Sequence, residues 1–576
     1  MVIFLIHIFL LLFTSTLSEK VIKTLNGPIV GKKLNFKKGY VSEYLGVPFA
    51  QPPIRELRFM PPVELNKPQW KHVLKAYIPA ISCPQYVEVM NFTGSDEFNP
   101  TNRIGENCLQ LNMWVPKERS GATIVHIHGG GYRRGSASLD IYNGSVLASK
   151  SKAIVVNLNY RFDIFGFAYL GEQSKIKGNM GLLDQQMGLK WVYENIEFFG
   201  GDKNMITIFG QSAGAASATA HLFSKESKKY FRRLFVDSGV ITNNWGSVDR
   251  DEMQKNTIKL VRHLKCPVKK GDEKLIKCLQ KRKMVRILEA SKEVRKTGQI
   301  ELLNQFSPID RDSVFFKGPV HILLEDKKFN KDVDLVVGRM ADETSVFMPR
   351  FLKNFGCGFN PLKDPEDKEN QCNLNEQIFA GFIDKVKGTI GLEDDEAKEY
   401  LQIYNNTNYD NYRDKMKKLT SDLVMNCPAS KFVEKIYNST RRNVYVYEFQ
   451  KRSPINPWPK WMGAMHGREL KYIFGYPYRY PSKYPEDKLK EEQKFSKKYM
   501  KFLGKFAKYG DLGKYSDKFT RNHKKALVID ETFAHSNKPK YIKSMSKTCK
   551  KFLNLIDRVV KRFISKVKVA SKFNRK

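Results

Sequence analysis

The sequence contains few histidine, cysteine and tryptophan residues. Only 10 of its 576 residues are histidine, 8 are cysteine and 6 are tryptophan. The histidines and cysteines form no recognised metal-binding motif, so we expect neither a metal ion nor a cofactor. Beyond the first residues there is also no stretch near the ~20 uninterrupted apolar residues that a membrane-spanning helix needs.

Acidic residues are scarce as well. The chain has 60 aspartates and glutamates against 99 lysines and arginines, and its net charge is +39. Such a charge could serve nucleic-acid binding, but the sequence contains no recognised nucleic-acid motif, and we expect no nucleic-acid partner. Two interpretations remain open. The basic residues could form a solvated lysine-rich surface, or they could attach the protein to anionic glycans or membrane surfaces.

The N-terminus indicates secretion. An apolar run over residues 2–13 and the small and polar residues after it predict a secretory signal peptide over residues 1–18. A retained signal anchor is the alternative. All cysteines follow this segment, as expected for an oxidising compartment, and four Asn-X-Ser/Thr sequons favour a secreted, extracellular glycoprotein. The sequons begin at Asn91, Asn143, Asn405 and Asn438.

Short apolar segments recur along the middle of the chain, separated by turns and helix-compatible stretches. They lie at residues 123–127, 153–158, 205–209, 234–236, 334–337 and 443–449. This pattern predicts an α/β fold whose central sheet is covered on both faces, with ligands at the carboxyl ends of the strands. Because no linker interrupts the pattern, we expect one catalytic domain over residues 19–539.

The last segment, residues 540–576, differs from the rest. Apolar residues recur at helical spacing among lysines and arginines, which predicts a C-terminal helix with a basic amphipathic tail. The apolar positions are Phe552, Leu553, Leu555, Ile556, Val559, Val560, Phe563, Ile564 and Val567. This stripe could dock on the body of the protein, or it could bind an anionic glycan or membrane surface.

The strongest local motif is Gly210-Gln211-Ser212-Ala213-Gly214, which follows a predicted strand and precedes a helix-compatible run. A serine hydroxyl is a weak nucleophile until a base removes its proton. A tight strand-to-helix turn exposes such a hydroxyl at the top of the sheet, and the flanking glycines allow neighbouring chain to approach. We therefore predict that Ser212 is the nucleophile of a serine ester hydrolase with the α/β-hydrolase fold.

A second glycine-rich motif, His128-Gly129-Gly130-Gly131, ends the predicted strand at 123–127. Acyl transfer needs backbone N–H groups that point at the oxyanion of the tetrahedral intermediate. We expect Gly130, Gly131 and Ala213 to donate them. An ordinary glycine-rich turn is the alternative.

An acid and a histidine should follow the serine along the chain. Three histidines lie in the last third of the sequence, and His466 is flanked by glycines and aromatic residues, whereas His523 and His535 lie in polar stretches. Asp342 and Glu343 both follow the predicted strand at 334–337. Composition alone does not choose between these two carboxylates.

These residues resemble the type-B carboxylesterases and, within that family, the cholinesterase branch. The resemblance covers residues 21–555 and is most specific at 43–50, 105–112, 179–186, 210–217 and 458–466. It implies a mostly parallel central sheet with helices on both faces and hydrolysis of small-molecule carboxylic esters. It also implies that Glu343 is the acid that orients the base His466, and that the reaction passes through an acyl-enzyme.

The resemblance implies a disulfide pattern too. Its pairs are Cys83–Cys108, Cys266–Cys278 and Cys427–Cys549. Cys357 and Cys372 are left over, and we predict that they pair with each other. No cysteine then remains for a link between chains, and the tail lacks the aromatic-rich pattern of tetrameric cholinesterases. We therefore expect a monomer or a loose homodimer.

The substrate pocket departs from the cholinesterase pattern. The resemblance places it at Phe98, Gln211, Trp245, Phe347 and Trp458. Cholinesterases hold the choline cation against aromatic faces, and Phe98 stands where they have tryptophan. Gln211 stands where they have glutamate. A weaker ring, a lost negative charge and the net charge of +39 all disfavour a cationic substrate.

Three hypotheses follow. The first is a secreted carboxylesterase with a weakened choline site, which prefers neutral or anionic esters. The second is a true acetylcholinesterase. The third is a non-catalytic adhesion or binding member of the family, and the presence of Ser212, Glu343 and His466 argues against it.

Overall fold

The computed structural model describes residues 20–573 apart from 38, 269–271, 297–304 and 537, and it describes side chains of the last helix up to Arg562. The expected signal peptide therefore lies outside the described residues. Within them, no helix is both long enough and apolar enough to cross a membrane.

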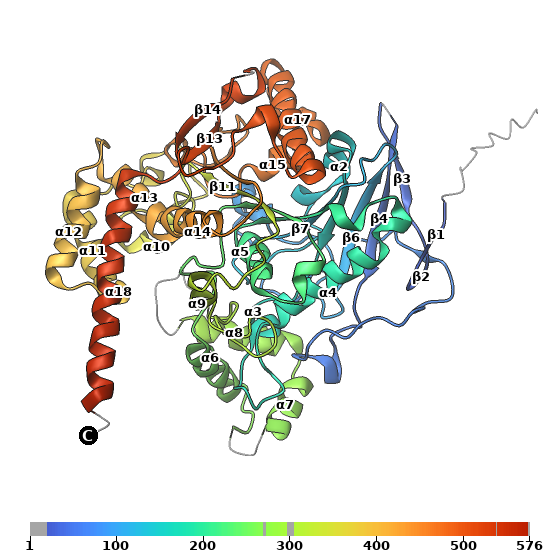
Figure 1. Ribbon diagram of the computed structural model, residues 1–576, viewed down its shortest axis with the longest axis horizontal. Helices are drawn as coiled ribbons and strands as arrows, with labels where there is room; N and C mark the ends of the chain where they lie inside the picture. The colour runs from blue at the N-terminus through green and yellow to red at the C-terminus, as the bar shows by residue number, and fades with distance from the viewer. Residues whose placement is uncertain (1–19, 38, 269–271, 297–304, 537, 574–576) are drawn as a thin grey trace, which may run out of the picture.

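A sheet of eleven strands forms the centre of the molecule, in the order β14-β13-β12-β11-β10-β9-β7-β8-β6-β4-β3 (Figure 1). Neighbouring strands from β8 to β13 are parallel, and both ends of the sheet are antiparallel. The strands are β3 (Lys32–Asn35), β4 (Tyr40–Pro48), β6 (Gln110–Pro116), β7 (Thr123–Ile127), β8 (Ile154–Leu158), β9 (Ile206–Gln211), β10 (Arg233–Asp237), β11 (Asp334–Met340), β12 (Val444–Phe449), β13 (Lys525–Ile529) and β14 (Lys540–Lys543). A mostly parallel sheet with helices is the α/β-hydrolase arrangement that the sequence predicts.

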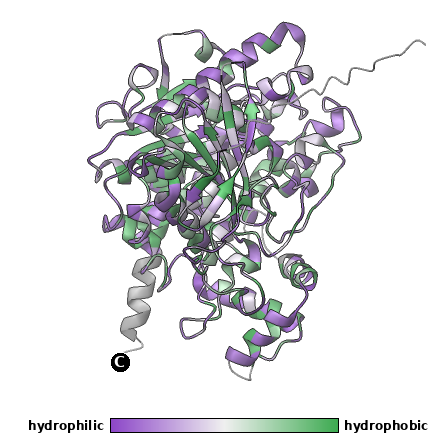
Figure 2. Cartoon of the chain, turned by 90° about the vertical axis from the view of Figure 1, so that its right-hand side faces the viewer, coloured by the Kyte–Doolittle hydropathy of each residue, from purple (hydrophilic) through white to green (hydrophobic). Residues whose placement is uncertain are grey.

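The two faces of the sheet carry separate apolar cores because side chains alternate along each strand. In β10, Leu234 and Val236 pack into one core and Phe235 into the other. The first core is covered mainly by α4 (Met180–Asn195), α5 (Ala213–Ala220) and α6 (Arg250–His263), and the second by α2 (Ser145–Ser151), α15 (Leu470–Ile473) and α17 (Glu486–Tyr509). Figure 2 shows hydrophobic colouring concentrated on the inner strands. Burial on both faces explains why the central strands read as nearly continuous apolar runs.

Further helices surround this centre. They are α1 (Thr93–Asp96), α3 (Asp163–Phe167), α7 (Asp272–Lys281), α8 (Met284–Lys296), α9 (Val320–Glu325), α10 (Met348–Phe351), α14 (Cys427–Tyr437) and α16 (Tyr476–Arg479). A small sheet of β1 (Ile22–Thr24), β2 (Gly27–Val30) and β5 (Leu74–Lys75) lies near the N-terminus. The four disulfides join Cys83 to Cys108, Cys266 to Cys278, Cys357 to Cys372 and Cys427 to Cys549, the same pairs as expected above.

A third core lies among α11 (Glu376–Ile390), α12 (Asp394–Asn405), α13 (Tyr412–Ser421) and α18 (Lys547–Phe573). Phe552, Leu555 and Val559 of α18 are buried there. The first part of the predicted tail therefore docks on the body of the protein. Leu553 and Ile556 are half-buried and Val560 is exposed, whereas Phe563, Ile564 and Val567 lie outside the described side chains.

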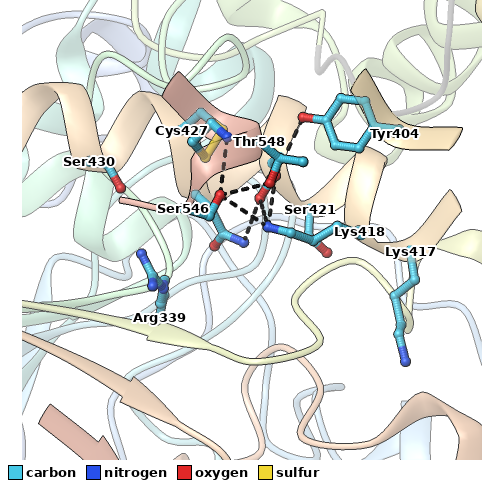
Figure 3. Close-up of polar contacts among 12 residues, drawn as sticks. Arg339, Tyr404, Lys417, Lys418, Ser421, Cys427, Ser430, Ser546 and Thr548 are labelled. Carbon is cyan, nitrogen blue, oxygen red and sulfur yellow. Dashed lines mark hydrogen bonds and ion pairs between the residues drawn. A yellow bond between two sulfur atoms is a disulfide. The ribbon is translucent and has the colours of Figure 1, made fainter. Parts of the chain in front are cut away.

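Polar contacts fix the start of α18 (Figure 3). The Ser546 hydroxyl accepts the Cys549 N–H at 3.0 Å and contacts the Thr548 hydroxyl at 2.9 Å. The Lys418 ammonium lies 2.7 Å from the buried Asp422 carboxylate and 3.5 Å from the Ser546 hydroxyl. Residues 540–543 form the edge strand β14 of the central sheet, so the start of the segment 540–576 belongs to the sheet and only the rest forms the C-terminal helix.

Candidate active site

Ser212 occupies a sharp turn between β9 and α5. Its backbone has φ 59° and ψ −126°, a conformation that costs energy and persists only where the surroundings enforce it. The Ser212 N–H donates to the Asp237 carbonyl of β10 at 2.9 Å. A Cβ at Gly210 would lie 2.3 Å from the Gly214 oxygen, and one at Gly214 would lie 2.0 Å from the Ile127 oxygen. Both glycines are needed because any side chain at either position would clash with a backbone carbonyl oxygen. The Ser212 side chain itself is partly exposed.

His466 and Glu343 meet beside this turn. His466 Nδ1 lies 2.8 Å from Glu343 Oε2, and the fully buried carboxylate also accepts the Met340 N–H at 2.9 Å. The neighbouring Asp342 points elsewhere, because it forms an ion pair with Lys417 at 2.7 Å. Of the two carboxylates left open by the sequence, the structure brings Glu343 to the histidine.

The other imidazole nitrogen faces Gln211. His466 Nε2 lies 3.2 Å from the Gln211 side-chain nitrogen, and the described residues contain no hydrogen bond between Nε2 and the Ser212 hydroxyl. An amide N–H can donate to Nε2 only if that nitrogen is unprotonated. With the Gln211 amide in this orientation, the imidazole proton would lie on Nδ1 against Glu343, which is the tautomer that a general base requires.

The glycine-rich loop 128–131 lies against the Ser212 turn. A Cβ at Gly129 would lie 2.6 Å from the Gln211 oxygen and 3.0 Å from Ser212 Cβ. Gly130 and Gly131 have φ of 116° and 60°, which favour glycine. Ala213 begins α5, so its N–H has no acceptor within the helix. The three expected oxyanion donors thus come from two segments that pack directly on each other.

His128 packs against this loop. Its Nδ1 lies 2.8 Å from the Gly129 oxygen, and its ring stacks on Tyr160 with centroids 4.7 Å apart. Burial lowers the pKa of His128 to about 4. The imidazole is therefore neutral at pH 7 and adds no charge to the site.

Four of the five expected pocket residues lie around Ser212 and His466. Phe347 has its ring 5.2 Å from the His466 ring, and Gln211 contacts the same imidazole. A Cβ at Gly467 would lie 3.8 Å from Phe98 and 3.6 Å from the Gln211 side-chain nitrogen.

Trp245 lies near the Ser212 backbone. A Cβ at Gly239 would lie 2.7 Å from the Ser212 oxygen and 2.9 Å from the Trp245 ring. Trp458 differs, since it is 7% exposed and packs between Phe92 and Phe359, with centroids 4.7 Å away on each side. Its indole N–H donates to the Gly94 oxygen at 3.2 Å.

Arg468 is a site residue that the sequence did not single out. Its guanidinium lies 5.5 Å from the centroid of the Phe98 ring, within cation–π distance. Glu97 pairs with Arg468, and the Gly94 carbonyl accepts from it at 2.6 Å. The Phe98 ring, which the resemblance places at the choline site of cholinesterases, therefore already contacts a cation of the protein itself. The only sequence signal was a basic residue two positions after His466.

Two buried acids, Glu469 and Asp237, lie near the site. Burial and the nearby Asp237 raise the pKa of Glu469 well above its usual range, and burial likewise raises the pKa of Asp237. Tyr447 donates its hydroxyl proton to Asp237. Because these acids favour the neutral form, they add little negative charge to attract a cation.

Other predicted residues lie apart from the site. His523 and His535 are exposed. The sequon residues Asn91 and Asn438 are exposed too, whereas Asn143 and Asn405 are half-buried and their side-chain oxygens accept hydrogen bonds from Ser145 and Lys415.

Residues 18–558 match the profile of the carboxylesterase family. The chain belongs to this family. It is 34% identical over 466 residues to a cholinesterase of Mus musculus, covering 80% of this chain and 75% of that protein. It is 34% identical over 481 residues to acetylcholinesterase 4 of Caenorhabditis briggsae, covering 79% and 76%. It is 32% identical over 514 residues to an acetylcholinesterase of Electrophorus electricus, covering 83% and 78%. This carboxylesterase is thus a cholinesterase-like carboxylic ester hydrolase, and its substrates are small-molecule esters.

Proposed function

We propose that this carboxylesterase is a secreted serine hydrolase with Ser212 as nucleophile, His466 as base and Glu343 as the residue that orients it. The observation that carries the proposal is the Glu343–His466 contact at 2.8 Å beside the Ser212 turn. The eight cysteines in four disulfides support an oxidising, extracellular location.

The reaction begins when an ester moves the Gln211 amide away from His466 Nε2. The Ser212 oxygen attacks the carbonyl carbon and its proton passes to Nε2. The N–H groups of Gly130, Gly131 and Ala213 receive the oxyanion. The bond to the alcohol oxygen then breaks, and the alcohol leaves with the proton from Nε2. Water repeats the sequence on the acyl-Ser212 ester, releases the carboxylic acid and restores the serine. Glu343 stabilises the imidazolium in both halves.

We propose further that the enzyme prefers neutral or anionic esters to choline esters. The supporting observation is Arg468 over the Phe98 ring. A quaternary ammonium at that ring would face a fixed guanidinium, and Gln211 supplies no charge to offset it. The names of the relatives favour the alternative, a true acetylcholinesterase, and a substrate comparison decides between them.

A covalent label tests the nucleophile. Incubation with an organophosphate ester should stop hydrolysis of naphthyl acetate and add one phosphoryl mass to the tryptic peptide that contains Ser212. Ser212→Ala should neither turn over substrate nor take the label, whereas Ser217→Ala, five residues along, should do both. Labelling at another serine, or turnover by Ser212→Ala, would refute the assignment, and an unlabelled inactive wild type would revive the non-catalytic alternative.

We retain one partner proposal for the tail. The part of α18 beyond Val559 could hold an anionic glycan or membrane surface, since the helix runs along α12 and then continues past it (Figure 1). Truncation after Arg562 should then weaken binding to vesicles of anionic lipid at physiological salt. With every cysteine paired within the chain, we propose a monomer or a loose homodimer.

A further inference from the structure

A basic pocket lies apart from the Ser212 site. It has a volume of about 250 Å³, near the small end of ligand sites, and lies between α17, β13 and the turn at 531–534. In Figure 1, α17 and β13 lie at the top of the molecule and α6 at the bottom. The catalytic serine follows β9, four strands away from β13 in the sheet. Nothing in the proposed ester chemistry uses this pocket.

Lysines dominate the wall of the pocket. Lys494, Lys497, Lys498 and Lys501 follow one another at helical spacing, so they share one face of α17. Lys514, Lys538 and Lys540 face them from the other side of the pocket. The described wall contains no aspartate or glutamate.

Nearby carboxylates neutralise little of this charge. Asp530 pairs with Lys540 at 2.9 Å, and Glu491 pairs with His535 outside the wall. Within the described residues, the other six wall lysines have no carboxylate within ion-pair distance. Six ammonium groups without acidic partners around one pocket repel each other, and a bound anion would relieve that repulsion.

Lys498 contacts two other residues of the wall, Ser536 and Phe533. Its ammonium donates to the Ser536 carbonyl at 2.8 Å and lies 4.9 Å from the Phe533 ring centroid. Burial, followed by the charges of Lys514 and Lys494, lowers its pKa. A half-buried ammonium at the base of a pocket, held by one carbonyl and a ring, favours a ligand that brings negative charge.

The chemistry of the wall defines the ligand. Lysine ammonium groups are point charges with rotatable donors, so they fit several oxyanions on one scaffold better than a single planar carboxylate. Tyr515, Phe533 and Pro539 add apolar surface on which a ring can lie. We propose that this pocket, defined by Lys494, Lys498 and Lys514, binds a ring compound that bears several sulfate or phosphate ester groups.

Two probes distinguish the sources of such a ligand. A heparin-type sulfated hexasaccharide represents extracellular glycans, and inositol hexakisphosphate represents phosphorylated small molecules. The full-length secreted protein is titrated with each by calorimetry at 150 mM salt. Binding of either probe supports the proposal and identifies its source. Failure of both, or equal binding of a desulfated hexasaccharide, would overturn it.

A charge-matched pair of variants locates the binding. Lys494→Gln/Lys497→Gln/Lys501→Gln/Lys514→Gln should raise the Kd about tenfold or more. The control is Lys255→Gln/Lys259→Gln/Lys281→Gln/Lys283→Gln, which removes the same charge from exposed lysines of α6 and α7 and their flank. Its effect should stay within about twofold. Equal weakening by the two variants would show that only net charge matters and would reject the pocket.

Two further measurements protect this conclusion. The chain truncated after Arg562 should keep its affinity for the probe. If the truncated chain loses affinity and the pocket variant does not, the probe binds the tail, and the proposal is contradicted. Hydrolysis of naphthyl acetate should be unchanged in the pocket variant, which shows that it is folded. If the quadruple variant does not fold, Lys494→Gln/Lys501→Gln should still raise the Kd about threefold.

Discussion

The side-chain nitrogen of Gln211 lies 3.2 Å from Nε2 of His466, so a neutral amide holds the nitrogen that the proposed mechanism needs as a base. The residue precedes Ser212 directly, and its side chain is almost fully buried. In the proposed mechanism, substrate selection and availability of the base are therefore coupled at the Gln211 side chain.

Gln211→Glu should increase the use of cationic esters. The carboxylate adds a negative charge beside the Phe98 ring, and an opposite charge at this range in a partly buried site contributes about 1 kcal/mol or more. We expect kcat/KM for acetylthiocholine, relative to its uncharged carbon isostere, to rise about fivefold or more. Gln185→Glu would be a poor control because that residue is fully buried, so exposed Gln69→Glu serves instead. An unchanged ratio would remove Gln211 from substrate selection.

Arg468→Gln should act in the same direction. Removing the guanidinium 5.5 Å from the Phe98 centroid frees that ring for a substrate cation. The same substrate ratio should rise about tenfold. Arg479→Gln is the matched control, because Arg479 also pairs with a carboxylate, Asp140, and lies 4.9 Å from the Tyr480 centroid. If both substitutions change the ratio equally, loss of overall charge explains the effect and Arg468 does not.

Glu343→Gln and Asp342→Asn should separate two adjacent carboxylates. The first removes the acceptor of the His466 Nδ1 proton, and kcat for naphthyl acetate should fall about 10³- to 10⁴-fold. The second removes an ion pair with Lys417 that is partly exposed, so kcat should stay within about twofold. The opposite ranking of the two variants would assign the orienting role to Asp342.

Gly130→Ala should damage catalysis through the backbone. A Cβ there would lie 1.9 Å from the Arg134 oxygen, so the loop must move and displace a proposed oxyanion donor. We expect kcat to fall about 10²- to 10³-fold. Gly381→Ala in α11 meets nothing within 4 Å and should keep full activity while stabilising its helix by about 0.5–1 kcal/mol. Normal turnover by Gly130→Ala would exclude the loop from oxyanion binding.

His128 should make the protein sensitive to acid. Burial lowers its pKa to about 4 in the folded chain, against about 6.5 in the unfolded chain. The unfolded state therefore takes up a proton first as pH falls, and stability is lost between about pH 6.5 and 4. Relative to His128→Gln, the free energy of unfolding should fall by about 3 kcal/mol over that range. The buried His221 is present in both proteins and cancels in this difference, whereas the charge of His128 also lowers the pKa of His126 and adds a further contribution of the same sign. Parallel stability curves would contradict the assignment of a neutral, buried His128.

The nucleophile turn could be predicted because its determinants are local. Gly210, Ser212 and Gly214 lie within five residues, and the contact that requires Gly210 is formed within the same turn, whereas Gly214 meets Ile127 of β7. The choice of Glu343 over Asp342 could not be made locally. It depends on a bridge between Asp342 and Met465 and on Lys417, which are far away in the sequence.

Contacts between residues far apart in the sequence also explain why the positions of Arg468, strand β14 and helix α18 could not be predicted. Arg468 is placed by Glu97, 371 residues earlier, so its position over Phe98 leaves no periodic signal. Strand β14 is short and basic, and it pairs only with β13 at the edge of the sheet, so its sequence lacks the apolar run of a central strand. The amphipathic pattern of α18 predicted a helix, but the pattern is the same whether the apolar stripe meets the body or an external partner.

The most direct test of the account compares two substrates that differ only in charge. The kcat/KM of the protein is measured for acetylthiocholine and for the thioester in which a quaternary carbon replaces the nitrogen, with Ser212→Ala as the blank. The account predicts that the uncharged ester is preferred by about tenfold or more and that Ser212→Ala hydrolyses neither. A preference for acetylthiocholine would contradict the proposed selectivity, and turnover by Ser212→Ala would contradict the proposed mechanism.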